Sequence, residues 1–171
     1  MKKALILVDF ENEWRDRDSD NYIEDISDVL GKTNELIDFC RKKGYKIIFI
    51  RHIEKGSQKE FAEGSDNIEI MDSLHKKEGD TTIKKYRISP FYPTNLESEL
   101  KGIKELVVCG ILTNLCVRSL VQDAYDRDFD IKIIEDCCIA FDEETHHFTL
   151  KDLKSTREEI EILNLKNFTR N

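Results

Sequence analysis

Short runs of apolar residues alternate along this chain with longer stretches in which apolar positions recur every three or four residues. Runs that are apolar almost throughout predict strands buried on both faces, and the helical recurrence predicts amphipathic helices. Strands are expected at 4–8, 46–50, 82–86, 106–109, 131–134 and 160–163. Helices are expected at about 22–42, at 94–101, from near 113 onward, and at 143–154.

Turn signals separate these elements. Gly44 follows a basic helix end and predicts a stop, and Gly110 is expected to end the strand before it. Thr94 with Glu97 has the form of a capping box. The pattern fades over 51–79, which predicts loops with a short helix around 70–74, and long irregular stretches often carry function.

Alternating strands and helices predict an α/β fold, a mostly parallel sheet with helices on both faces, in one domain over 1–171. Ligands bind such sheets at the carboxyl ends of the strands. Three features are expected there: Asp9 after the first strand, the Arg51–His52 pair after the second, and the turn 110–116.

Cys116 lies where a strand has ended and a helix begins. A helix N-terminus lowers a thiol's pKa and offers free N–H groups to an oxyanion, although a free Cys is often simply a buried core residue. Asp9 is interpreted as a general base for the thiol or as an architectural ion pair. Lys85 is a candidate to hold the thiolate by charge, whereas Lys84 is expected to face solvent.

A metal site is not expected. Residue 50, two positions before His52, is Ile rather than an acid, and the five cysteines form no CxxC pair. An odd number of cysteines also argues against a disulfide framework, with a vicinal bond between Cys137 and Cys138 as the less favoured alternative.

Three segments together resemble the isochorismatase-like cysteine hydrolase superfamily, which includes nicotinamidases, carbamoylsarcosine amidases and isochorismatases. They are the first strand with its acid at 7–14, the stretch 83–96, and the turn 110–117. The second segment matches a pattern with Lys four residues before Ser-x-Phe, which selects Lys85. The third matches Gly-x-x-Thr-x-x-Cys-Val and makes Cys116 the nucleophile.

The resemblance implies a three-layer α/β/α sandwich with a six-stranded, mostly parallel sheet, and a small-molecule substrate without a cofactor. Asp9 would take the proton of Cys116, Lys85 would hold both groups, and the thiolate would form a thioester. The oxyanion would be held by N–H groups of Leu115 and Cys116 or Leu112, beside a cis peptide at Ile111–Leu112. The superfamily also implies a homo-oligomer, a dimer or tetramer.

Departures from the family pattern bear on the substrate. Glu11 stands where Gln is common, Trp14 stands where Phe is common, and Ile50-Arg51-His52 replaces the Asp-x-His metal motif of nicotinamidases. The expected substrate-binding residues are therefore Glu11, Trp14, His52 and Phe91.

The composition argues against some classes of binding partner. The 171 residues carry a net charge of −8, which disfavours nucleic acid and anionic membranes, and no apolar run is long enough to span a bilayer. We expect a cytoplasmic enzyme that hydrolyses a small amide. The alternatives are vinyl ether cleavage and a non-enzymatic binding protein on the same fold. A receiver-like signalling domain would leave the Cys116 turn unexplained.

Overall fold

The computed structural model describes residues 2–170, which form a six-stranded sheet in the order β3-β2-β1-β4-β5-β6. Every neighbouring pair of strands is parallel, so the predicted sheet is confirmed and is parallel throughout. The strands are β1 (Lys2–Val8), β2 (Lys46–His52), β3 (Thr81–Lys85), β4 (Ile103–Ile111), β5 (Asp130–Ile139) and β6 (Glu161–Leu163).

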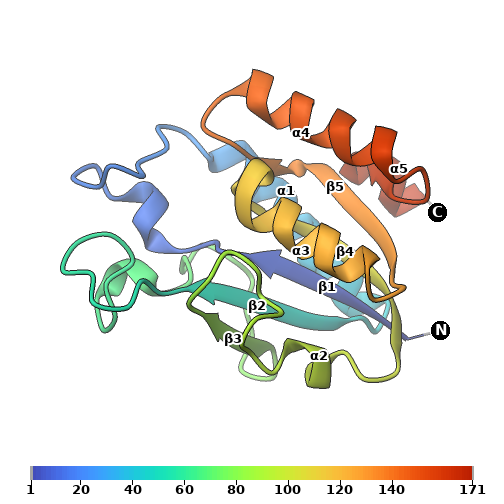
Figure 1. The fold of residues 1–171 in the computed structure, drawn as a ribbon, viewed down its shortest axis with the longest axis horizontal. Coiled ribbons are helices and arrows are strands. Elements are labelled where there is room, and N and C mark those ends of the chain that lie inside the picture. The colour runs from blue at the N-terminus through green and yellow to red at the C-terminus, as the bar shows by residue number, and fades with distance from the viewer. Residues whose placement is uncertain (1, 171) are drawn as a thin grey trace.

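Helices cover both faces of the sheet, which gives three layers (Figure 1). The helices are α1 (Ser27–Lys42), α2 (Leu96–Glu99), α3 (Arg118–Tyr125), α4 (Glu143–Thr156) and α5 (Leu165–Arg170). Short 3-10 turns occupy η1 (Asn12–Arg15) and η2 (Asp66–Ile68), and a π-helical turn occupies η3 (Thr113–Val117). Helix α5 packs with α1 against β5, while α4 packs with the η3 turn. No helix within residues 2–170 is long and apolar enough to cross a membrane.

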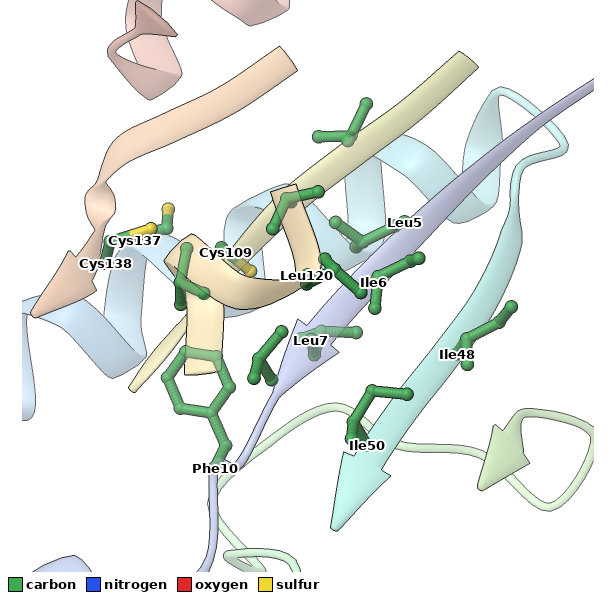
Figure 2. Packing of buried hydrophobic residues seen from close by; sticks show 14 of the residues in the cluster. Leu5, Ile6, Leu7, Phe10, Ile48, Ile50, Cys109, Leu120, Cys137 and Cys138 are labelled. Atoms are coloured by element: carbon green, nitrogen blue, oxygen red, sulfur yellow. The ribbon is translucent and has the colours of Figure 1, made fainter. Parts of the chain in front are cut away.

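The core lies between β1 and the helices. Residues 4–8 of β1 are fully buried, as their unbroken apolar run predicts. Leu120 of α3 lies next to Ile6, and Ile48 and Ile50 extend the same layer from β2 (Figure 2). Burying one such aliphatic side chain contributes about 1.5–3 kcal/mol, so this layer is a major source of the fold's stability.

Two predictions about helices are wrong for local reasons: one helix begins later than expected, and another is absent. Helix α1 begins at Ser27 rather than near residue 22, because the Asp25 carboxylate accepts hydrogen bonds from the N–H and hydroxyl of Ser27. The helix expected at 70–74 is absent, since Ile70 forms a β-bridge with Glu11 and the short helical turn lies earlier, at 66–68. Both differences lie in segments next to the carboxyl edge of the sheet.

Gly110 does not end its strand, because β4 continues through it to Ile111. Its φ of +150° suits glycine, and a Cβ there would lie 2.4 Å from the Val8 carbonyl oxygen. The absence of a side chain therefore lets β1 and β4 approach each other beside the turn that carries Cys116. Opposite this point β5 changes register, and Cys137 and Cys138 are both free and buried (Figure 2).

Candidate active site

Three of the predicted residues meet at the carboxyl edge of the sheet. Asp9 follows β1, Lys85 is the last residue of β3, and Cys116 lies in the η3 turn after β4. Lys85 Nζ is 2.8 Å from Asp9 Oδ2 and donates a hydrogen bond to Cys116 Sγ at 3.1 Å. One buried ammonium group therefore contacts both the carboxylate and the sulfur.

The backbone of Asp9 is held in an unusual conformation. Its φ is +55°, a left-handed value that Asp tolerates better than most residues. The Asp9 N–H donates to the Ile50 carbonyl, and the Asp9 carbonyl accepts from the Trp14 indole N–H at 2.7 Å and from the Glu11 N–H at 3.0 Å. These bonds orient the carboxylate toward Lys85.

Lys85 is fully buried, yet it stays charged. Burial lowers its pKa, but the Asp9 charge and the hydrogen bonds to Asp9 and Cys116 outweigh burial, so the pKa lies above its ordinary value. His52 Nδ1 lies 3.1 Å from Lys85 Nζ, and burial together with the Lys85 charge lowers the pKa of this histidine. The neutral imidazole accepts a hydrogen bond from the ammonium.

The expected lowering of the Cys116 pKa is wrong. Burial raises the pKa of this thiol, the Asp9 charge raises it further, and Lys85 lowers it only in part. Burial outweighs the expected effect of the helix end, and the Asp9 carboxylate beside the sulfur adds to it by opposing a second negative charge. In the free protein Cys116 is therefore a thiol paired with an ionised Asp9–Lys85 couple. It is half-buried, whereas the other four cysteines are buried.

The turn that carries Cys116 contains the expected cis peptide bond, between Ile111 and Leu112. The Leu112 carbonyl accepts from the N–H groups of Leu115 and Val117, both at 3.2 Å. The Leu115 amide is thus already engaged, which leaves Leu112 and Cys116 as the stronger candidates for oxyanion donors.

A contact that the sequence did not predict braces this turn from α4. Thr113 is fully buried, and its Oγ1 lies 2.8 Å from Nδ1 of His146. Burial lowers the pKa of His146, and neighbouring His147 lowers it further, so the ring is neutral near pH 7. The spacing of 33 residues between Thr113 and His146 leaves no local signal in the sequence.

Glu11 is fully buried and lies beside Asp9. Burial raises its pKa well above the usual range, the Asp9 charge raises it further, and Lys85, Arg51 and the His52 backbone N–H lower it only in part. Neither Glu11 carboxyl oxygen makes a hydrogen bond of ordinary geometry within the described residues. These surroundings favour the protonated form of Glu11, whose carboxyl group has no protein partner of ordinary geometry among the described residues.

Aromatic rings lie in a row beside the site. Trp14 packs edge-to-face on Phe61 at 5.3 Å and on Phe141 at 6.2 Å between ring centroids, and Phe61 packs on His52 at 5.1 Å. Two of the expected substrate-binding residues, Trp14 and His52, are thus brought together near Lys85.

Phe91 lies elsewhere. Its ring is 6.5 Å from that of Phe129, and the Arg127 guanidinium lies 4.4 Å above it. Arg127 and Phe129 follow the far end of α3, so Phe91 is not among the side chains that meet at Cys116.

Two charged residues outside the predicted catalytic and substrate-binding set hold the neighbouring loops in place through hydrogen bonds. The Glu13 carboxylate is fully buried and accepts hydrogen bonds from the Ser19 hydroxyl and from the Phe61 N–H. Arg51 donates to the Ile68 carbonyl at 2.6 Å and to the Glu69 carboxylate at 2.6 Å. The irregular segment after β2 is thus anchored beside the aromatic row. Within residues 2–170, no group of three or more His, Cys, Asp or Glu side chains is arranged to hold a metal ion.

Comparison with known proteins identifies the family of this chain. The family model described as the Isochorismatase domain matches residues 3–161. The chain belongs to the isochorismatase family. As a member of this family it is a hydrolase.

The proteins that this chain resembles include both an enzyme and a relative named as probably inactive. The chain is 27% identical over 165 residues to nicotinamidase 3 of Arabidopsis thaliana, covering 88% of this chain and 79% of that protein. It is 26% identical over 172 residues to a probable inactive nicotinamidase of the same plant, covering 89% and 88%. An isochorismatase-like hydrolase from Alkaliphilus metalliredigens shares the fold, with a TM-score of 0.89, 21% identity, and coverage of 99% and 98%.

Proposed function

We propose that this protein hydrolyses the C–N bond of a small amide through a covalent thioester on Cys116. The observation that carries the proposal is the buried Lys85 ammonium that contacts both Asp9 and Cys116. Similarity to a nicotinamidase supports amide chemistry as the reaction class.

In the first half of the reaction, the Cys116 sulfur attacks the amide carbonyl carbon while its proton moves to Asp9. The high thiol pKa makes this transfer concerted with attack, because a free thiolate beside Asp9 is disfavoured. The negative charge that develops on the carbonyl oxygen is stabilised by N–H groups at Leu112 and Cys116. The C–N bond then breaks, and the amine leaves with the proton from Asp9.

In the second half, a water molecule gives its proton to Asp9 and attacks the thioester carbon. The carboxylic acid leaves and the sulfur takes back a proton, so the enzyme returns to its starting state. Lys85 contacts both the Asp9 carboxylate and the Cys116 sulfur, so one ammonium group stabilises negative charge on either partner as protons move between them.

The surroundings support a small polar substrate. Trp14 and His52 supply an aromatic wall, and the protonated Glu11 supplies a hydrogen-bond donor where related enzymes commonly have an amide. Vinyl ether cleavage remains the alternative hydrolysis, and the inactive relative is the reason to test for a binding protein as well.

The decisive experiment looks for the covalent intermediate. The protein is mixed with a panel of small primary amides, quenched in acid within milliseconds to seconds, and its intact mass is measured. We expect an added acyl group on Cys116, release of ammonia, and loss of both in Cys116→Ala. Ammonia release without dependence on Cys116, or ether cleavage without an adduct, would contradict the proposal.

Alkylation of the thiol tests the assigned protonation state. Replacing Asp9 by Asn removes the charge that raises the Cys116 pKa and leaves Lys85 to favour the thiolate, so we expect iodoacetamide at pH 7 to react faster, by up to about tenfold per unit of pKa change. Amide hydrolysis should nevertheless be lost. Cys116→Ala serves as the control for the site of labelling, and slower alkylation of Asp9→Asn would show that the carboxylate does not oppose the thiolate.

A further inference from the structure

A cavity of about 730 Å³ lies at the amino-terminal edge of the sheet. It is bordered by the first residues of β1, β2 and β4 and by the segment that follows α1. This edge, near the labelled N- and C-termini, is opposite the strand ends that carry Asp9 and Lys85 (Figure 1). A seven-residue strand is roughly 20 Å long, so the cavity is separate from the Cys116 site.

The cavity is basic although the protein is acidic, with a net charge of −8. Its lining contains six lysines: Lys2, Lys3, Lys43, Lys46, Lys101 and Lys132. Three carboxylates pair with some of them. Glu105 lies 2.9 Å from Lys3 and 3.5 Å from Lys132, Glu99 lies 2.6 Å from Lys46, and Glu161 lies 3.5 Å from Lys132.

Three lysines of the lining keep an unpaired charge. Within residues 2–170, no carboxylate lies within ion-pair distance of Lys2, Lys43 or Lys101. Six ammonium groups therefore face three carboxylates, and the excess of three positive charges is concentrated at one concave surface. Such a surface attracts anions with several negative charges.

The same cavity has aromatic walls. The rings of Phe39 and Phe168 pack edge-to-face at 5.5 Å, and Tyr45 lies beside them in the lining. Lys43 Nζ is 5.3 Å from the Phe39 ring and Lys3 Nζ is 5.5 Å from the Tyr45 ring. Cations are thus held next to ring faces, an arrangement that suits a ligand with both a planar ring and negative charge.

A simpler role explains only part of the cluster. Cations at a helix C-terminus stabilise the helix, and this accounts for Lys43 at the end of α1. It does not account for Lys2 or Lys132, which lie on strands, or for the aromatic residues between them.

We propose that this cavity binds an organic anion that carries a planar ring and at least two negative charges, the class to which nucleoside diphosphates belong. The unpaired lysines bind the anionic group, and Phe39, Tyr45 and Phe168 accept the ring. The volume lies within the range of about 300–1,000 Å³ that is typical of small-molecule sites. The proposal is independent of the reaction at Cys116.

The test is calorimetric titration of the whole protein with three probes: ADP, inorganic pyrophosphate and adenosine, without metal, at low salt and at 150 mM salt. The test variant is Lys43→Glu combined with Lys101→Glu. Its matched control is Lys77→Glu with Lys151→Glu, which changes the net charge equally at exposed lysines outside the cavity lining. Circular dichroism checks that each variant folds, and a Lys43→Gln/Lys101→Gln variant replaces the charge reversal if it does not.

We expect saturable 1:1 binding of ADP that is tighter than binding of pyrophosphate or adenosine and that weakens with salt. Lys43→Glu/Lys101→Glu should weaken ADP binding at least tenfold, and the control should change it less than twofold. No saturable binding, or equal weakening in both double variants, would overturn the site. Equal affinities for ADP and pyrophosphate would overturn the role of the aromatic rings.

Discussion

The two edges of the sheet carry similar charged groups in opposite settings. At the carboxyl edge Lys85 and Asp9 are 0% and 1% exposed, and they form an ion pair at 2.8 Å. At the amino edge Lys46 and Glu99 form an even shorter pair, at 2.6 Å, but their side chains are 34% and 32% exposed. Water screens the second pair, which is worth about 0–1 kcal/mol, while breaking the first leaves a charge stranded in the interior. The two pairs therefore differ in burial rather than in the type of charge.

The largest expected contrast between the edges involves two glycines. Gly110→Ala places a Cβ 2.4 Å from the Val8 carbonyl, so β1 and β4 must separate, and we expect a loss of more than about 4 kcal/mol in the free energy of unfolding, or no folded protein. Gly44→Ala, at the amino edge, meets nothing within 4 Å and suffers only from its φ of +77°, at a cost of roughly 1–2 kcal/mol. Denaturant unfolding measures both, and similar losses would contradict the close approach of β1 and β4.

The next contrast involves two lysines. Lys85→Met leaves Asp9 buried without its partner, and we expect a loss of about 3–5 kcal/mol in stability at pH 7. Lys43→Met, which removes an exposed and unpaired cation at the other edge, should change stability by less than about 0.5 kcal/mol. A loss below about 1 kcal/mol for Lys85→Met would show that Asp9 finds another partner.

The smallest effect depends on pH and tests Glu11. Its folded pKa is raised, so the folded state holds the proton more tightly, and the resulting stability is present in acid and lost as pH rises from about 4.5 toward the folded pKa. Glu11→Gln keeps the shape and removes the ionisation. We expect this variant to gain stability relative to the native protein as pH rises above about 4.5, by up to about 1.4 kcal/mol per pH unit until the folded pKa is reached, with no gain near pH 4. Parallel stability profiles for the two proteins would contradict a neutral Glu11.

The fold was predictable because its signals are local. Continuous apolar runs identified the four central strands, and parallel strand ends must meet at one edge, which placed Asp9 near the Cys116 turn. The position of Lys85 relied on the resemblance to a family, since a basic run alone predicts a solvent-exposed face.

Other properties of the site depend on tertiary contacts. The direction of the Cys116 pKa was predicted wrongly, because burial and the carboxylate beside the sulfur appear only once the strands assemble. The Thr113–His146 contact joins residues 33 positions apart, and the hydrogen bond from the Phe61 N–H to Glu13 joins residues 48 positions apart. A pattern of apolar positions cannot predict contacts at such separations. Helix α1 begins late because of one side chain, Asp25, which a pattern of apolar residues does not register.

Trp14 is the only tryptophan of the chain, and its indole N–H holds the carbonyl of Asp9. Its intrinsic fluorescence therefore reports on one edge of the sheet alone. A red shift of emission would record loosening of the segment around Asp9 even if β4, β5 and the lysine cavity stayed intact, whereas circular dichroism records the helices as a whole. Comparing the two signals during unfolding would reveal whether the catalytic edge opens before the rest of the protein.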